Sequence, residues 1–309
     1  MDPNPPVVPA PVVGCYAHAT HVAGIVGATV GNGKTRAGVY AGVNMVSVTA
    51  GFSYYQSEAA SNCITTSTQL SASTLGLALD FIRWDTAVWQ GYNSPVHIAT
   101  MSLNSIGTGF NSDGTAQTNY SKLQQLVTPG FVFSYYWSPA VLFVQSAGNQ
   151  NTDSCSLTST ATGTAAYKTS AYAQSTAVDG IVVVGAIDNT GAAVSGSSKS
   201  FAASEPAAIT GSGGGSNYGG CVDMWAPGQM IYSTWGYGIF STSGNAVYSG
   251  GQPNSYVPPQ AWYGGNAGYG GWAWLSGTSM AAPHVAAAAA YLADNYNLTT
   301  RIAIENALR

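Results

Sequence analysis

Charged side chains are scarce in this sequence. Lys, Arg, Asp and Glu together make up 6% of the 309 residues, and the formal net charge is −4. Soluble domains ordinarily carry about a quarter charged residues. With only 8 Lys and Arg the sequence offers no basic patch. This excludes a nucleic-acid-binding protein, because such proteins neutralise phosphates with clustered cations.

Long apolar runs are missing as well. No stretch approaches the roughly 18 consecutive apolar residues that cross a bilayer, so we expect no membrane span. The first residues, Met1-Asp2-Pro3-Asn4-Pro5-Pro6, lack the basic and apolar regions of a signal peptide. If the protein is secreted, we expect its export signal to lie outside this sequence.

Cysteine is rare, and its spacing excludes a zinc-finger type of site. Cys15, Cys63, Cys155 and Cys221 contain no C-x-x-C pair. Their even number allows two disulfides in any of three connectivities, and four buried free thiols are the alternative. Paired cysteines, few lysines and abundant Ser, Thr, Gly and Tyr favour an extracellular location.

Apolar runs alternate with helical patterns along the chain. Helices are predicted around residues 18–27 and over residues 75–89, and strands over residues 39–48, 96–103, 140–146 and 181–186. Such alternation is typical of a mostly parallel central sheet with helices on both faces, an α/β fold in three layers.

We expect a single domain over residues 1–309, since neither an internal repeat nor a linker divides the chain. Residues 211–271 are rich in Gly, Ser, Tyr and Trp and are predicted to form loops. Within this region, residues 222–228 are predicted to form a strand followed by a turn.

Ser279 lies in the most informative segment, Gly277-Thr278-Ser279-Met280-Ala281-Ala282-Pro283-His284-Val285, which leads into an alanine-rich helix. We place Pro283 in the first helical turn, where its missing N–H needs no partner. A serine at a helix N-terminus is favourably placed for a reaction that develops negative charge. A serine that merely caps a core helix is the alternative.

His18 and Asn149 complete a candidate constellation. Each lies where a strand or loop meets a helix or turn, and such points gather at the carboxyl ends of parallel strands. A hydroxyl nucleophile needs a base that titrates near neutral pH, which histidine supplies. A side-chain amide can donate to the oxyanion.

These segments resemble those of the subtilisin-like serine proteases (subtilases), most closely the proteinase K/aqualysin branch. The His18 segment is similar to the family's H-G-T-H-V-A-G motif, and the Ser279 segment to G-T-S-M-A-x-P-H-V. Ser146-Ala147-Gly148-Asn149 is similar to A-A-G-N, and residues 222–228 are similar to V-D-x-x-A-P-G. The motifs also follow one another in the family's order.

The resemblance implies a three-layer subtilisin-like fold and a serine endopeptidase of broad specificity. Ser279 would be the nucleophile, His18 the general base and then acid, and Asn149 the oxyanion donor. Peptides or proteins would be the substrates, and no cofactor is expected for catalysis.

Further roles follow from the same resemblance. Ser102 and Leu103 would pair with the substrate backbone as an added strand. Ser146, Ala147 and Gly148 would wall the pocket for the residue before the cut. The cysteines follow the aqualysin pattern, which implies the pairs Cys15–Cys63 and Cys155–Cys221.

Other acidic and histidine positions carry alternatives. Asp223 matches a position that helps to bind a structural calcium in proteinase K relatives, although calcium takes six or more oxygens. His21 and His284 match structural motif positions. His97 has no motif and is interpreted as a packed strand histidine.

The sequence departs from the family pattern in several places. The family's D-T-G or D-S-G turn is not found before His18, so we expect the catalytic aspartate and its strand to lie outside this chain, with both ends trimmed. Ala19 stands where the family has glycine. Residues 236–270 form an apparent loop insertion.

Two other hypotheses remain at this point. A catalytically impaired subtilase-like fragment could serve as a self-assembling extracellular surface protein, with the Tyr/Gly-rich insertion packing against copies of itself. A partner chain could alternatively supply the missing strand and its aspartate.

Overall fold

The structure is a computed structural model. It describes residues 17–30, 37–48, 52–53, 68–69, 72–84, 97–102, 122–123, 125–128, 132–133, 136–137, 140–153, 178–195, 214–235 and 271–309.

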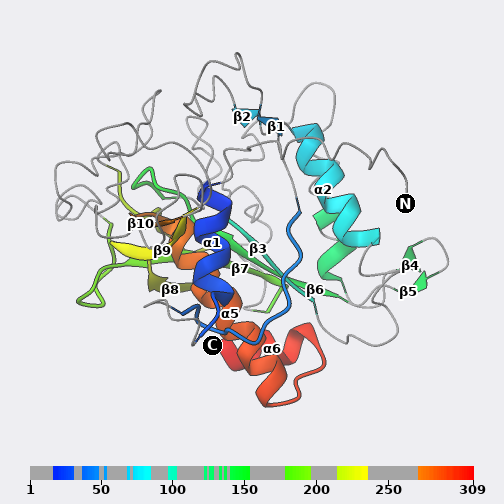
Figure 1. The fold of residues 1–309 in the computed structure, drawn as a ribbon. Coiled ribbons are helices and arrows are strands. Elements are labelled where there is room, and N and C mark those ends of the chain that lie inside the picture. The colour runs from blue at the N-terminus through cyan, green and yellow to red at the C-terminus, as the bar shows by residue number, and fades with distance from the viewer. Residues whose placement is uncertain are drawn as a thin grey trace, which may run out of the picture.

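A four-stranded parallel sheet forms the centre of the described fold (Figure 1). Its order is β3 (His97–Met101), β6 (Val141–Ser146), β7 (Ile181–Ile187) and β8 (Met224–Pro227). The registers include Ala99 opposite Phe143 and Val144 opposite Val182. Strands β6 and β7 are buried almost end to end, as expected when helices cover both faces of a parallel sheet.

One face of this sheet packs against α2 (Ala72–Trp84) and a helical segment near residues 122–127. Leu79 on α2 and Leu126 meet Phe143 and Val183 in a continuous apolar cluster. Alternate strand residues point to opposite faces, so the neighbours of Phe143 and Val183 contribute to the second cluster on the other face.

The opposite face packs against the long helix α5 (Thr278–Asn295) and α6 (Arg301–Leu308). Alanines of α5, among them Ala282 and Ala286, meet Leu142, Val144 and Val184. Small helix residues let the helix axis approach the sheet closely. Helix α1 (Ala17–Gly27) packs in turn against α5, as Figure 1 shows. The predicted three-layer α/β fold is confirmed.

A hairpin that the sequence analysis missed supports α1. Strand β9 (Ile231–Trp235) pairs antiparallel with β10 (Gly271–Leu275), and Trp235 lies opposite Gly271. The predicted insertion of residues 236–270 is therefore bracketed by two paired strands. The insertion itself lies outside the described residues, so its predicted structure is untested.

Further short elements are the antiparallel pairs β1 (Phe52–Ser53) with β2 (Thr68–Gln69), and β4 (Val132–Phe133) with β5 (Tyr136–Trp137).

The predicted strand over residues 39–48 is wrong. Residues 39–42 form a turn in which Val43 donates its N–H to the carbonyl of Tyr40, and residues 43–48 belong to no strand. Alternating apolar residues become a strand only with a ladder partner, and these residues pair with none in the described part of the chain. Residues 1–16 lie outside the described residues, so the predicted absence of a first strand is untested.

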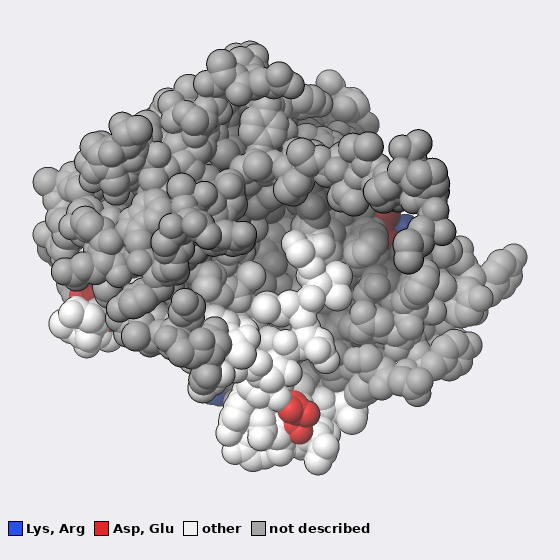
Figure 2. Space-filling model, in the orientation of Figure 1, with Lys and Arg blue, Asp and Glu red and all other residues white. Residues whose placement is uncertain are grey.

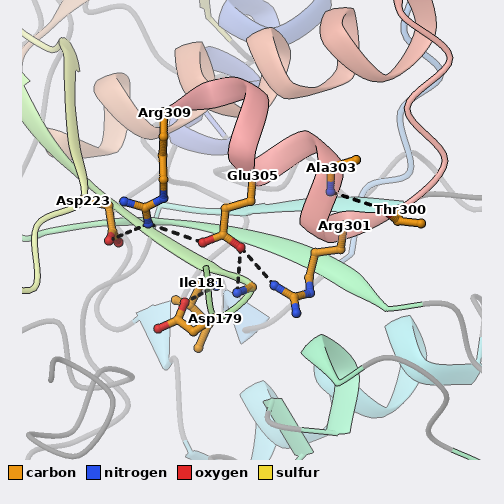
Figure 3. Close-up of polar contacts among 9 residues, drawn as sticks. Asp179, Ile181, Asp223, Thr300, Arg301, Ala303, Glu305 and Arg309 are labelled. Carbon is orange, nitrogen blue, oxygen red and sulfur yellow. Dashed lines mark hydrogen bonds and ion pairs between the residues drawn. The ribbon is translucent and has the colours of Figure 1, made fainter. Parts of the chain in front are cut away.

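Helix α6 is joined to the sheet by buried ionic groups (Figure 3). Glu305 is completely buried, and its Oε2 accepts hydrogen bonds from the Gly180 N–H at 2.9 Å and from Arg301 at 3.0 Å. Gly180 directly precedes β7, so these bonds attach the helix to the start of a central strand.

Arg309 extends the same network. Its Nη2 donates to Oδ1 of Asp223 at 3.0 Å and to Oε1 of Glu305 at 3.4 Å. A second ionic group joins Asp80 of α2 to Arg83 and Lys122. On the face that Figure 2 shows, in the orientation of Figure 1, most of the described surface is uncharged.

Candidate active site

Ser279 is the second residue of α5 and is half-buried. The helix begins after Gly277, whose φ of 153° favours glycine. A Cβ at Gly277 would lie 3.1 Å from Nδ2 of Asn149. The glycine therefore permits both the backbone turn into α5 and the close approach of the Asn149 amide to it.

The Asn149 side chain is tied to the same turn. Its Oδ1 accepts hydrogen bonds from the backbone N–H and the hydroxyl of Thr278, both at 2.9 Å. The Thr278 hydroxyl also accepts from the Gly148 N–H at 3.0 Å. Because Oδ1 is occupied, Asn149 presents its Nδ2 donor beside the residues that precede Ser279, and the residue is exposed.

Ser102 contacts Ser279 twice. The Ser102 hydroxyl donates to the Ser279 carbonyl at 2.8 Å, and the Ser279 hydroxyl donates to the Ser102 carbonyl at 3.4 Å. Pro283 lies four residues after Ser279 inside α5. This corrects the expectation that Pro283 occupies the first turn. Because proline has no N–H, Pro283 cannot donate the usual helical hydrogen bond to the Ser279 carbonyl. The Ser102 hydroxyl donates to that carbonyl instead.

His18 is the second residue of α1 and is exposed, although protein atoms crowd around it enough for desolvation to lower its pKa. Helix α1 packs against α5. In the described part of the chain His18 forms no hydrogen bond with Ser279, whose hydroxyl contacts Ser102 instead. The structure thus brings Asn149, Ser279 and Ser102 together and places His18 on the adjoining helix.

Helix α1 is held by hydroxyl groups of β9. Thr234 donates to the Thr20 carbonyl at 2.7 Å, and Ser233 to the His21 carbonyl at 2.8 Å. A Cβ at Gly24 would lie 2.0 Å from the Thr234 hydroxyl oxygen. The small residues of this segment therefore permit close packing, as the sequence analysis expected.

The side chains of His21 and His284 contact backbone carbonyl groups. His21 is completely buried, with Nε2 3.2 Å from the Ile231 carbonyl, and Nδ1 of His284 lies 2.8 Å from the Met280 carbonyl. Burial lowers the pKa of His284, while its bond to Met280 acts in the opposite direction. These contacts suit the structural roles expected for both. His97 is on β3, and its side chain is not described.

Several predicted site residues are buried or lie outside the described residues. Ser146, Ala147 and Gly148 are buried at the end of β6 and just beyond it. Their role as a pocket wall stays a prediction. Leu103 lies outside the described residues. Cys221 is disulfide-bonded, but Cys15, Cys63 and Cys155 are not described, so both predicted pairings are untested.

Asp223 has protein partners on both carboxylate oxygens. Oδ2 accepts from the Val183 N–H at 2.8 Å, and Oδ1 accepts from Arg309. Within the described residues, no cluster of three or more His, Cys, Asp or Glu side chains is placed to hold a metal. A structural calcium at Asp223 stays a prediction and would have to compete with Arg309.

Sequence reasoning missed the roles of Thr278 and Asn217. Thr278 lies inside a recognised motif, yet its hydrogen bonds to Gly148 and Asn149 depend on partners far away in the sequence. Asn217 is completely buried and bonds to the segment that carries Asn149. No local pattern distinguishes it from an exposed loop asparagine.

The parallel sheet, its helices on both faces and a serine in the first turn of α5 define a three-layer α/β protein of the subtilisin-like type. The sequence profile of the Subtilase family (peptidase S8) matches residues 3–309, and the chain belongs to this family.

Known proteins similar to this chain are proteases. Alkaline serine exoprotease A of Vibrio alginolyticus is 27% identical over 92% of the chain and 33% of its own length. A protease of Pseudoalteromonas arctica (22% identity, TM-score 0.50) and the S41 psychrophilic protease (20% identity, TM-score 0.50) share the fold over 94% of this chain. The chain spans 62% and 67% of those two structures.

Among the described residues, no helix combines the length and apolar character needed to cross a membrane.

Proposed function

We propose that the chain is a serine endopeptidase that cleaves peptide bonds of proteins, with Ser279 as nucleophile. His18 is the general base and then the general acid. Nδ2 of Asn149 and the backbone N–H of Ser279 donate to the oxyanion. The observation that carries this proposal is the pair of bonds between Thr278 and Asn149, which orients the amide donor beside the turn before Ser279.

The proposed reaction assigns one role to each of these residues. The Ser279 hydroxyl leaves the Ser102 carbonyl and gives its proton to His18 as its oxygen attacks the substrate carbonyl carbon. Negative charge passes to the carbonyl oxygen, where the amide and the helix N-terminus stabilise it. His18 then protonates the leaving amine, and water hydrolyses the acyl-enzyme by the same steps in reverse.

Further features belong to the same proposal. Ser102, at the end of the edge strand β3, and Leu103 pair with the substrate backbone. The small residues Ser146 to Gly148 fit broad specificity. Within the described residues no carboxylate contacts His18. The low charge and paired cysteines favour an extracellular protein.

A fluorophosphonate probe that labels activated serines tests the proposal. We expect the wild-type chain to be labelled and Ser279→Ala not to be labelled. Ser276→Ala is the matched control: its hydroxyl accepts from the Met230 N–H at 2.9 Å beside the site and should leave labelling intact. Folded wild-type protein that does not react, or reacts equally after Ser279→Ala, would contradict the proposal.

A further inference from the structure

Asn217 is a completely buried amide whose side chain is fully engaged with residues 147–152. Its Oδ1 accepts from the backbone N–H groups of Gln150 at 3.0 Å and Thr152 at 3.2 Å. Its Nδ2 donates to the Ala147 carbonyl at 3.0 Å and to Oε1 of Gln150 at 2.9 Å. These bonds use both donor hydrogens and both acceptor positions of an amide.

Residues 147–152 need such support because they leave the sheet after β6. Gly148 has a φ of 105° and Asn151 a φ of 55°, conformations that turn the chain out of a ladder. The last bond of this segment to the central sheet is that of the Ala147 N–H to the Val184 carbonyl of β7 at 3.0 Å. Beyond Ala147 the polar backbone groups need other partners, because unpaired ones are costly where the chain is buried. Asn217 supplies them for Gln150 and Thr152, while Gly215 and Tyr218 bond Asn151 and the Thr152 carbonyl.

Asn217 is itself fixed to the sheet. The Ser216 hydroxyl accepts from the Ala186 N–H of β7 at 3.0 Å and donates to the Asn217 carbonyl at 2.9 Å. The Asn217 N–H donates to the Gly148 carbonyl at 2.8 Å. A short chain of hydrogen bonds thus joins a central strand to the loop that carries Asn149.

The loop is held from two directions. Thr278, at the start of α5, binds Gly148 and the Asn149 side chain. Asn217 binds the backbone on both sides of Asn149, through Ala147 and Gly148 before it and Gln150 after it. The side chain of Asn149 therefore projects from a backbone that is fixed immediately before and after it.

We propose that Asn217 is a positioning residue for the oxyanion donor. By holding the backbone around Asn149 it aims Nδ2 at the site where negative charge develops. This inference rests on the proposed function, and Asn217 acts through Asn149. An oxyanion donor works only at hydrogen-bond distance from the developing charge. Its displacement should lower kcat and leave KM nearly unchanged, because it contributes to the transition state alone.

A double-mutant cycle on a peptide substrate tests this coupling. Loss of an oxyanion donor lowers kcat about 10²–10³-fold, a magnitude that comes from subtilisin, itself a subtilase, and is adopted here. We expect Asn217→Ala to lower kcat at least about tenfold with KM within about threefold, and to change kcat less than about threefold when Asn149→Ala is already present. An equal loss in both backgrounds would show that Asn217 supports the fold generally and would overturn the proposal.

Glu305→Gln is the control for general stability, since Glu305 is equally buried and bonds to the start of the same strand β7. It should leave kcat unchanged. If Asn217→Ala does not fold, Asn217→Asp is the second variant, because it keeps the shape and the acceptor but lacks the donor to Ala147. The same non-additivity with Asn149→Ala is expected.

Backbone hydrogen exchange gives a readout that does not need peptidase activity. In Asn217→Ala, which removes their acceptor, we expect the N–H groups of Gln150 and Thr152 to exchange at least about tenfold faster, while those of Val144 and Val182 keep their protection. No change in the loop, or equal acceleration throughout the sheet, would overturn the inference. A wild-type chain without Ser279-dependent labelling would instead overturn the proposed function, and the exchange result would still show whether Asn217 holds the loop.

Discussion

Ser102 donates its hydroxyl to the carbonyl oxygen of Ser279, 2.8 Å away, at the position where Pro283 has no N–H to give. Ser279, the proposed nucleophile, is thereby linked to β3, the outermost described strand on that side of the sheet, as well as to its own helix. The proline that interrupts the helical hydrogen bonds makes a carbonyl available to a side chain from another element. This relationship gives the first prediction.

Ser102→Ala should lower the free energy of unfolding by about 1 kcal/mol, the usual net value of a hydrogen bond. In a Pro283→Ala background residue 283 can donate to the Ser279 carbonyl, so the same change should cost much less. Urea unfolding of the two single variants and the double variant measures the difference. Equal costs in both backgrounds would show that the two residues are not coupled.

Thr278→Val removes the hydroxyl that links Gly148 to Asn149 and keeps the shape of the side chain. We expect kcat on a peptide substrate to fall about tenfold, less than for loss of the donor itself, because the Thr278 backbone N–H still binds Asn149. Thr278→Ser keeps the hydroxyl and is the control. Similar values for both variants would mean that the hydroxyl contributes nothing to the position of Asn149.

His18 gives a pH dependence of probe labelling. Desolvation lowers its pKa from the ordinary value of 6.5. The base must be neutral to accept the Ser279 proton, so a lowered pKa extends reactivity to lower pH. We expect the acid limb of the labelling rate to have its midpoint below 6.5. A midpoint above the ordinary value would contradict this, and His18→Gln should abolish the limb together with most of the rate.

Glu305 gives a pH dependence of stability with an unusual sign. Burial is the largest effect and, with Asp179 nearby, raises the pKa of Glu305, while the Gly180 N–H, Arg301 and Arg309 act against it. The folded protein therefore holds this proton more tightly than the unfolded chain. Its contribution to stability is largest at low pH and falls as pH rises above the ordinary value of 4.5.

Glu305→Gln should remove this component. Urea unfolding across a pH series compares the two proteins: relative to the variant, the wild type should lose stability as pH increases above 4.5. Parallel curves would show that the pKa of Glu305 is the same in the folded and unfolded chains.

Two glycines with positive φ allow the free-energy cost of backbone strain to be measured apart from the cost of overpacking. Gly180 has a φ of 91°, and a Cβ there would lie 2.7 Å from Cβ of Val127 and 2.8 Å from Cδ of Arg301. Gly191 has a φ of 79° with no atom within 4 Å of such a Cβ. Gly191→Ala should cost about 1–2 kcal/mol from backbone strain, and Gly180→Ala about 1–3 kcal/mol more from overpacking. Equal free energies of unfolding for the two variants would contradict this.

The central part of the fold could be predicted because its signals are local. Strands β6 and β7 are continuous apolar runs, and α5 combines a helix start with an alanine-rich face, so each is visible in a short window. The hairpin of β9 and β10 was missed because it pairs segments separated by residues 236–270, and its strands lie in a region rich in Gly, Ser, Tyr and Trp. Its stability depends on a pairing that no short window contains.

The residues of the candidate site also fall into those that a short window of sequence predicts and those that it does not. Ser279, His18 and Asn149 could be chosen from motifs and from the chemistry of their side chains. Asn217 could not, because a buried asparagine and an exposed one look alike until the strands are assembled. Thr278 was in view, but its partner Gly148 lies 130 residues away. Residues that carry out chemistry leave a local signature, whereas residues that hold them in place often do not.

The support around Asn149 is electroneutral. Asn217, Ser216 and Thr278 hold the loop through amide and hydroxyl groups, which do not ionise at ordinary pH. The Glu305–Arg309 ion pair lies at the other end of β7, against the start of that strand. Acidification should therefore protonate His18 without changing the orientation of Nδ2 of Asn149. The protonation of His18 and that of Glu305 should be independent of each other. A titration of labelling can then be interpreted as a titration of the base.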